Sequence, residues 1–117
     1  KEKEMANTFR LINNAVMPTS AGTGDALYTV GSSKTSVVLG LTLSNVHTAQ
    51  VTTTVTIIDS SASITSTLIK DAPIPVGGSL EIMSGNKIVL ETTDIIKVDC
   101  SVADKISATM SVMEIDV

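Results

Sequence analysis

The side chains that could do chemistry are few and lie scattered along this chain of 117 residues. His47 is the single histidine and Cys100 the single cysteine, which leaves little from which to build a catalytic triad or a zinc site. No serine stands in a G-x-S-x-G elbow. Asp94 and Asp99 are close in sequence, but carboxylates near strand ends ordinarily serve as turn residues. The sequence therefore predicts no enzymatic activity, no metal site and no cofactor.

Composition argues against several other classes of function. A net charge of −4 and a pI near 4.7 offer no basic surface to a phosphate backbone, so we expect no direct binding of nucleic acid. No run of 18 apolar residues occurs, so no membrane span is expected. Sugar-binding modules commonly present aromatic rings, and this chain has only Phe9 and Tyr28 to offer.

The residue types favour β-structure. Valine (13), isoleucine (12) and threonine (16) make up more than a third of the chain, and β-branched side chains suit pleated surfaces. In the stretch Asp71–Val102, alternating residues are separated by short turns, which predicts antiparallel hairpins. Pro73 and Pro75 mark an edge or an entry into a strand, because proline cannot donate to a sheet ladder. Cys100 falls on the inward face of its strand and is expected to be a core residue.

Two other strands have a clear pattern. In Thr35–Asn45, the side chains of Val37, Leu39, Leu41 and Leu43 alternate with smaller or more polar ones and are expected to face the core. The last strand begins at Ile106 and alternates in the same way. The apolar residues Met113 and Ile115 then fall on its opposite face. A bulge would explain this change, as would a strand end covered from both sides by a subunit contact.

The whole pattern predicts eight to ten short strands and no helix. Strands spaced every 8–12 residues are typical of an all-β fold, here an antiparallel β-sandwich of jelly-roll-like type. We expect a single sandwich domain over residues 26–117. Residues 1–25 are expected to form an N-terminal extension and arm.

The first residues of the chain suggest a start that precedes the native one. Residues 1–4 read Lys-Glu-Lys-Glu and come directly before Met5. A cloning remnant, a true extension or a misplaced start would each explain them. Lys-Glu can be encoded as a bacterial ribosome-binding sequence at a suitable distance from Met5. On that hypothesis the native protein begins at Met5, trimmed to Ala6, and the gene is bacterial or from a phage.

The segment that follows could act inside its own domain or outside it. Residues 9–16 can form a first strand, and residues 18–25 are a polar linker rich in small residues. One interpretation is a loop that crosses the end of its own sandwich. The other is an arm that reaches a neighbouring subunit.

Three segments, Tyr28–Leu41, Lys70–Leu80 and Lys87–Glu91, carry a resemblance to a known family. They resemble small virion structural proteins from tailed phages, of the marine or cyanophage-like kind. The family pattern runs Tyr-Thr-Val-Pro-x-Gly-Lys, then Pro-x-Gly-x-x-Leu, then Lys-Ile-Val-Leu-Glu. The resemblance covers most of residues 26–115 and departs at Gly31, where proline is common. It implies a repeated structural subunit of the virion and no active-site residue.

From this resemblance we expect a capsid decoration, or cement, protein on the outside of the phage head. A neck or tail component is the alternative, and a stand-alone carbohydrate-binding or adhesion module is a third class. The expected partners are further copies of the chain, with a trimer as one form, and the major capsid protein or other virion proteins. The candidate subunit contacts are two apolar residues of the arm, two prolines and two residues of the last strand: Phe9, Leu11, Pro73, Pro75, Met113 and Ile115.

Overall fold

The computed structural model describes residues 7–83 and 86–117. The suspected non-native residues 1–4 lie outside these ranges. The described chain forms nine strands and no helix, so it has no helix that could span a membrane. The strands are β1 (Asn7–Met17), β2 (Asp25–Thr29), β3 (Lys34–Asn45), β4 (Val51–Asp59), β5 (Ile64–Ile74), β6 (Ser79–Glu81), β7 (Ile88–Leu90), β8 (Ile95–Cys100) and β9 (Ile106–Asp116). The predicted all-β sandwich is confirmed, although β1, β3, β5 and β9 are longer than the short strands expected.

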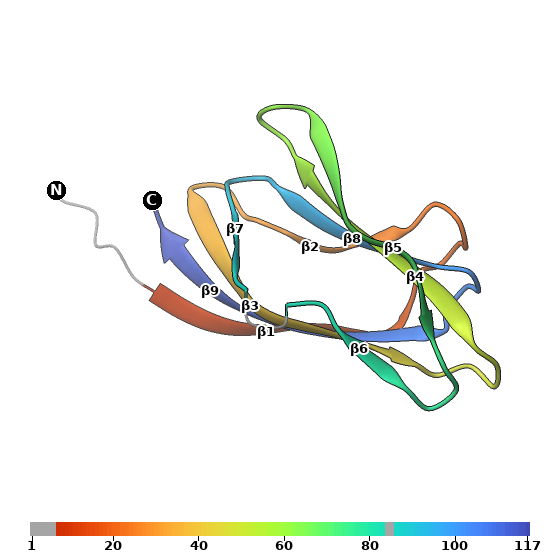
Figure 1. The fold of residues 1–117 in the computed structure, drawn as a ribbon. Helices are drawn as coiled ribbons and strands as arrows, with labels where there is room; N and C mark the ends of the chain where they lie inside the picture. The colour runs from red at the N-terminus through yellow and green to blue at the C-terminus, as the bar shows by residue number, and fades with distance from the viewer. Residues whose placement is uncertain (1–6, 84–85) are drawn as a thin grey trace, which may run out of the picture.

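Two antiparallel sheets face each other as layers (Figure 1). Sheet A has the order β1-β9-β3, and both β6 and β7 pair with the far side of β3. Sheet B has the order β2-β8-β4-β5. β1, which the sequence placed in an arm, pairs with β9 over most of its length. Whether this segment also reaches a neighbouring subunit stays a prediction.

The connections between strands differ from the predicted hairpins. Among the described strands, β4 and β5 are the one pair of chain neighbours that hydrogen-bond to each other. In the stretch Asp71–Val102, β6 and β7 both pair with β3, whereas β8 lies in the other sheet. The hairpin prediction is therefore wrong there. A short turn forces the chain to reverse, but it does not decide whether the next strand joins the same sheet or crosses to the opposite one.

The core lies between the inward faces of the two sheets. From sheet B it receives Val55 and Val98, and from sheet A it receives Leu41, Leu43 and Met110, all fully buried. Inward and outward residues alternate along β4 and β8, as the two-residue period predicted. Cys100 is also buried, which confirms its expected inward position.

A bulge in β3 overturns part of the predicted face assignment. Val38 pairs with Val112 and Gly40 pairs with Ser111, so Leu39 has no partner on β9. The extra residue changes which positions face inward. Val38 is fully buried, whereas Val37 and Leu39 lie half-buried on the outer side. The prediction that these two residues face the core is wrong for this reason.

β9 itself is regular where the sequence suggested a change of register. Its pairing with β1 continues without a shift from Ala108 to Ile115. The inward position between Met113 and Ile115 is taken by Glu114, which is buried. The apolar pattern changes face because a glutamate replaces an apolar residue at that inward position. The two flanking residues face outward as the strand geometry requires.

Candidate functional site

Four of the six candidate contact residues lie together on the outer face of sheet A. Phe9 is directly opposite Met113, Leu11 is opposite Ser111, and Ile115 is opposite Asn7. Residues directly opposite each other in an antiparallel pair lie on the same face of the sheet. Phe9 is 72% exposed and Leu11 is 63% exposed, so their apolar surface faces solvent.

The apolar surface extends across β3 to β7. Val37 is directly opposite Met113 on one side and opposite Val89 on the other. Leu39 lines a hollow of about 360 Å³ together with Phe9 and Leu11. We call the whole set the outer apolar patch; its members are Phe9, Leu11, Val37, Leu39, Val89, Met113 and Ile115. Contiguous exposed apolar patches commonly mark sites of interaction with another protein.

The sequence did not indicate the middle of this patch. Val37 and Leu39 were assigned to the core, and the bulge places them outside. Val89, which is 60% exposed, was not among the candidate contact residues. No local signal distinguishes Val37 and Leu39 from core residues, because their position depends on the bulge in the pairing with β9.

The two candidate prolines lie in a different place. Pro73 is exposed in β5, the edge strand of sheet B, where a missing N–H is tolerated. Pro75 is exposed in the following turn, and its carbonyl oxygen accepts a hydrogen bond of 2.9 Å from the Gly78 N–H. Because β5 belongs to the other layer, the prolines are not part of the outer apolar patch.

A set of hydrogen-bonded polar side chains lies between the two layers near the C-terminal end of β9. Tyr28 of β2 donates a hydrogen bond to the Glu114 carboxylate and lies within hydrogen-bonding distance of the Ser36 hydroxyl. Arg10 Nη1 contacts Glu114 Oε2 at 3.0 Å. Burial raises the pKa of the Tyr28 hydroxyl above its ordinary value, and its hydrogen bond to Glu114 raises that pKa further. Each buried polar atom of this group has a partner, which is the arrangement expected of a structural network.

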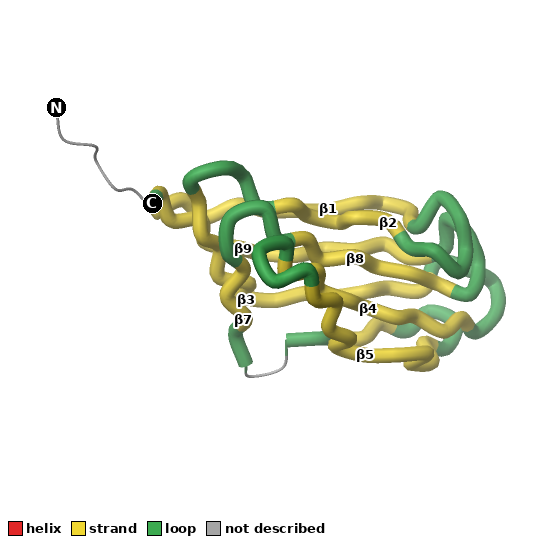
Figure 2. The backbone as a smooth tube through the Cα atoms, turned by 90° about the horizontal axis from the view of Figure 1, so that it is seen from above, coloured by secondary structure: helices red, strands yellow, loops and turns green. Residues whose placement is uncertain are grey.

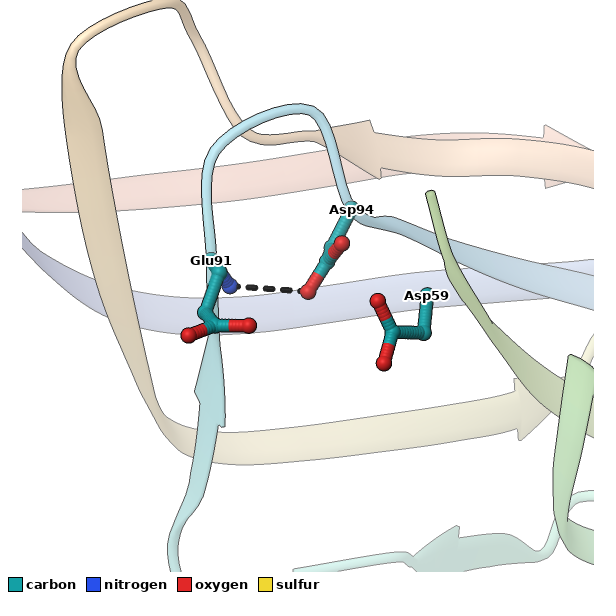
Figure 3. A group of neighbouring side chains, drawn as sticks. All are labelled: Asp59, Glu91 and Asp94. Atoms are coloured by element: carbon teal, nitrogen blue, oxygen red, sulfur yellow. Dashed lines mark hydrogen bonds between the residues drawn. The ribbon is translucent and has the colours of Figure 1, made fainter. Parts of the chain in front are cut away.

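Three carboxylates meet where β4, β7 and β8 end or begin. Oxygen atoms of Asp59, Glu91 and Asp94 lie within 4.8 Å of one another (Figure 3). Both oxygens of Asp94 already accept backbone hydrogen bonds, one from Ser60 N–H at 3.1 Å and one from Glu91 N–H at 2.9 Å. Asp94 therefore holds two loops together, in agreement with its predicted role as a turn residue.

Asp99 has a similar role at the other end of β8. Its Oδ1 atom accepts hydrogen bonds from Gly22 N–H at 2.9 Å and from Cys100 N–H at 2.8 Å. The bond to Gly22 attaches the loop after β1 to sheet B. Asp99 also lines a hollow of about 280 Å³, together with Asp71 and Thr54.

Comparison with known proteins finds the same fold in two kinds of assembly. No protein-family model matches the sequence, and no curated protein matches it. A chain of Bacillus endospore appendages, which form a family of disulfide-linked pili, aligns with a TM-score of 0.56 and 13% identity over 100% of this chain and 92% of that one. A chain of the T13 particle of infectious bursal disease virus (IBDV) aligns with a TM-score of 0.54 and 16% identity over 94% of this chain. This sandwich is shared with chains of pili and of virus particles.

A third structure, the VP2 subviral particle of infectious bursal disease virus, aligns with a TM-score of 0.51 and 14% identity over 96% of this chain. The present chain spans about a third of each of the two viral chains, 31% and 32%. At these identities the similarity establishes the fold. A tailed-phage origin of the chain stays a proposal.

Proposed function

We propose that this chain is a non-enzymatic structural subunit of a virion, and in particular a capsid decoration protein on the outside of a tailed-phage head. The outer apolar patch carries this proposal, because it joins four of the residues nominated as subunit contacts on one exposed sheet face. The fold is also found in chains of virus particles and of pili, which are built from many subunits. The proposed location is the virion.

The proposed partners are further copies of the chain, with a trimer as one form, and the major capsid protein or another virion protein. An uncharged patch suits contacts in which apolar surface is removed from water. Neither nucleic acid nor a membrane is a proposed partner. The net negative charge of the chain supports the exclusion of nucleic acid, because it disfavours binding to a phosphate backbone.

A neck or tail component of the same virion is the alternative, since a sandwich with an apolar patch could serve in either place. The carbohydrate-binding alternative has less support. Tyr28 is buried, and its hydroxyl is engaged by Glu114, so it cannot present a ring to a sugar. Phe9 is then the one aromatic ring exposed in the described chain.

The copy number in purified particles tests this proposal. Quantitative mass spectrometry would compare this chain with the major capsid protein. A ratio near one supports decoration of the whole head lattice. A ratio of a few per cent supports the neck or tail. Absence from the particles would reject the virion proposal, and affinity of the isolated chain for a glycan array would then support the adhesion module.

A further inference from the structure

The sandwich has edge strands along two long sides, and they differ in how well they are protected against pairing with another chain. Unpaired N–H and C=O groups on an edge strand can pair with another strand. β6 and β7 have three residues each, and β2 has five with a register shift. β5 is longer, but its pairing shifts register twice, and it carries Pro73 and the charged residues Lys70 and Asp71. Short length, bulges, proline and charge all discourage pairing.

β1 lacks these protections over most of its length. It has 11 residues without a proline, and its pairing with β9 is regular from Asn7 to Asn14. Its one charged residue is Arg10, whose guanidinium group is paired with Glu114 at 3.0 Å. Phe9 and Leu11 of the outer apolar patch lie on this strand. β1 is thus the long, regular and apolar edge among the strands that the structure describes.

We propose that β1 pairs antiparallel with β1 of a second copy of this chain, about a two-fold axis that runs through the sheet at Leu11. The inference rests on the proposed function, in which the chain is a repeated subunit. Pairing about this two-fold axis places odd-numbered residues of one copy opposite odd-numbered residues of the other, and even-numbered residues opposite even-numbered ones. The apolar residues of both copies therefore fall on the same outer face, and sheet A continues from one copy into the next.

Charge favours a second copy as the occupant of this edge. The chain carries a net charge of −4, so two copies repel each other unless they meet where charge is low. β1 and β2 run along the same long side of the molecule (Figure 2). Asp25, the charged residue of β2, accepts hydrogen bonds from the Thr19 N–H and hydroxyl. The Asp25 carboxylate keeps its negative charge, but Arg10 is paired with Glu114, so β1 itself brings no unpaired charge to the contact.

The position of Arg10 excludes the axis at Arg10 itself, and Leu11 is the exposed apolar residue nearest the middle of the regular segment Asn7–Asn14. Centring the pair on Arg10 would place two guanidinium groups directly opposite each other, which is destabilising. Centring it on Leu11 places Leu11 opposite its own copy and Arg10 opposite Ile12 of the second copy. A hollow of about 410 Å³ lies between β1 and β2 and is lined by both strands, so the second copy approaches an open side of the sandwich.

Sedimentation equilibrium of the full chain tests the pairing. The unmodified chain is expected to form dimers as its concentration rises. Leu11→Lys places two ammonium groups opposite each other and is expected to raise the dissociation constant by about tenfold or more. Ile64→Lys is the matched control, because Ile64 is 55% exposed on β5 and lies outside β1. A chain that stays monomeric, or dimers that Leu11→Lys leaves unchanged, would overturn the proposal.

Cysteine cross-linking tests the axis independently of any loss of folding. Cys100 is buried, so an added surface cysteine supplies the reactive thiol. Oxidised Leu11→Cys is expected to give a covalent dimer, whereas Ile64→Cys is expected to give none. Equal cross-linking of both variants would contradict the proposed contact. Failure of this pairing can be told apart from failure of the proposed function. If particles contain the chain but no β1 cross-links form, only the pairing is rejected. If β1 dimers form but the chain is absent from particles, only the virion role is rejected.

Discussion

The Tyr28 hydroxyl of sheet B donates a hydrogen bond to the Glu114 carboxylate of sheet A, and both residues are buried. This contact joins the two layers. Glu114 also accepts a hydrogen bond from Arg10 of β1. The same carboxylate therefore fixes the distance between the layers and holds the start of β1, which carries part of the outer apolar patch. The candidate assembly surface depends on a buried polar contact beneath it.

Removing the Tyr28 hydroxyl should destabilise the fold. Tyr28→Phe leaves Glu114 buried with one fewer donor, and a buried group that loses a partner costs about 1–3 kcal/mol. Chemical denaturation measures the free energy of unfolding. Ser111→Ala is the control, because Ser111 is exposed on the outer face of β9 and its loss should change stability by no more than about 0.5 kcal/mol. Equal stability of both variants would show that the contact contributes nothing.

The pKa of Tyr28 should be measurable directly, because the chain has one tyrosine. Ultraviolet absorbance is expected to give a midpoint above 10.0 for the folded chain and a midpoint near that ordinary value in denaturant. A group whose pKa is raised on folding holds its proton more tightly in the folded state. Its contribution to stability is full below the unfolded pKa and is lost as pH rises through the folded pKa.

The stability difference between the unmodified chain and Tyr28→Phe should therefore narrow as pH rises above about 10. Lys34, whose pKa is raised by its hydrogen bond to Asp116, titrates in both proteins and cancels in the comparison. Denaturation at several alkaline pH values measures this gap. A gap that stays constant through the titration of the folded tyrosine would contradict the assigned burial of the hydroxyl.

Asn45 should be the most sensitive amide in the described chain. Its Nδ2 atom donates to the carbonyl oxygens of Ala49 and Ile74, each at 2.9 Å, and its Oδ1 atom accepts from the His47 N–H at 2.7 Å. Asn45→Ala leaves the buried carbonyl oxygen of Ile74 without this donor and should cost about 1–3 kcal/mol. Asn13→Ala removes the same group from an exposed position and should cost little. Thermal denaturation of the two variants distinguishes the sites, and equal melting temperatures would refute the role of Asn45.

Removal of β1 tests whether it is a strand of the sandwich or a detachable arm. A chain that begins at Pro18 lacks one of the two strands that pair with β9 and loses Met17, which is fully buried. We expect it to lose cooperative unfolding, as measured by circular dichroism during denaturation. A chain that begins at Ala6 retains β1 and serves as the control. If the shorter chain unfolds as cooperatively as the control, β1 is an arm in the sense suggested by the sequence.

The local pattern determined where the strands are. The strands predicted at residues 9–16, at Thr35–Asn45 and from Ile106 coincide with β1, β3 and β9, since alternation with a period of two depends only on neighbours in the chain and on which side of the strand faces water. The inward position of Cys100 follows for the same reason. The edge position of Pro73 was predicted because proline cannot donate to a sheet ladder. The sequence also nominated four of the residues that meet on the outer face of sheet A.

Only the tertiary structure decided which strands are neighbours. β6 and β7 join β3 instead of forming hairpins, and the bulge at Leu39 turns part of β3 outward. These features depend on hydrogen bonds between residues far apart in sequence, so no local pattern contains them. The position of Glu114 could not be predicted from the sequence either. A glutamate on a strand is expected to face solvent, and its partners Tyr28 and Arg10 are brought to it only by folding. The position of each strand follows from the local sequence, whereas the surface that several strands form together depends on how they pair in the tertiary structure.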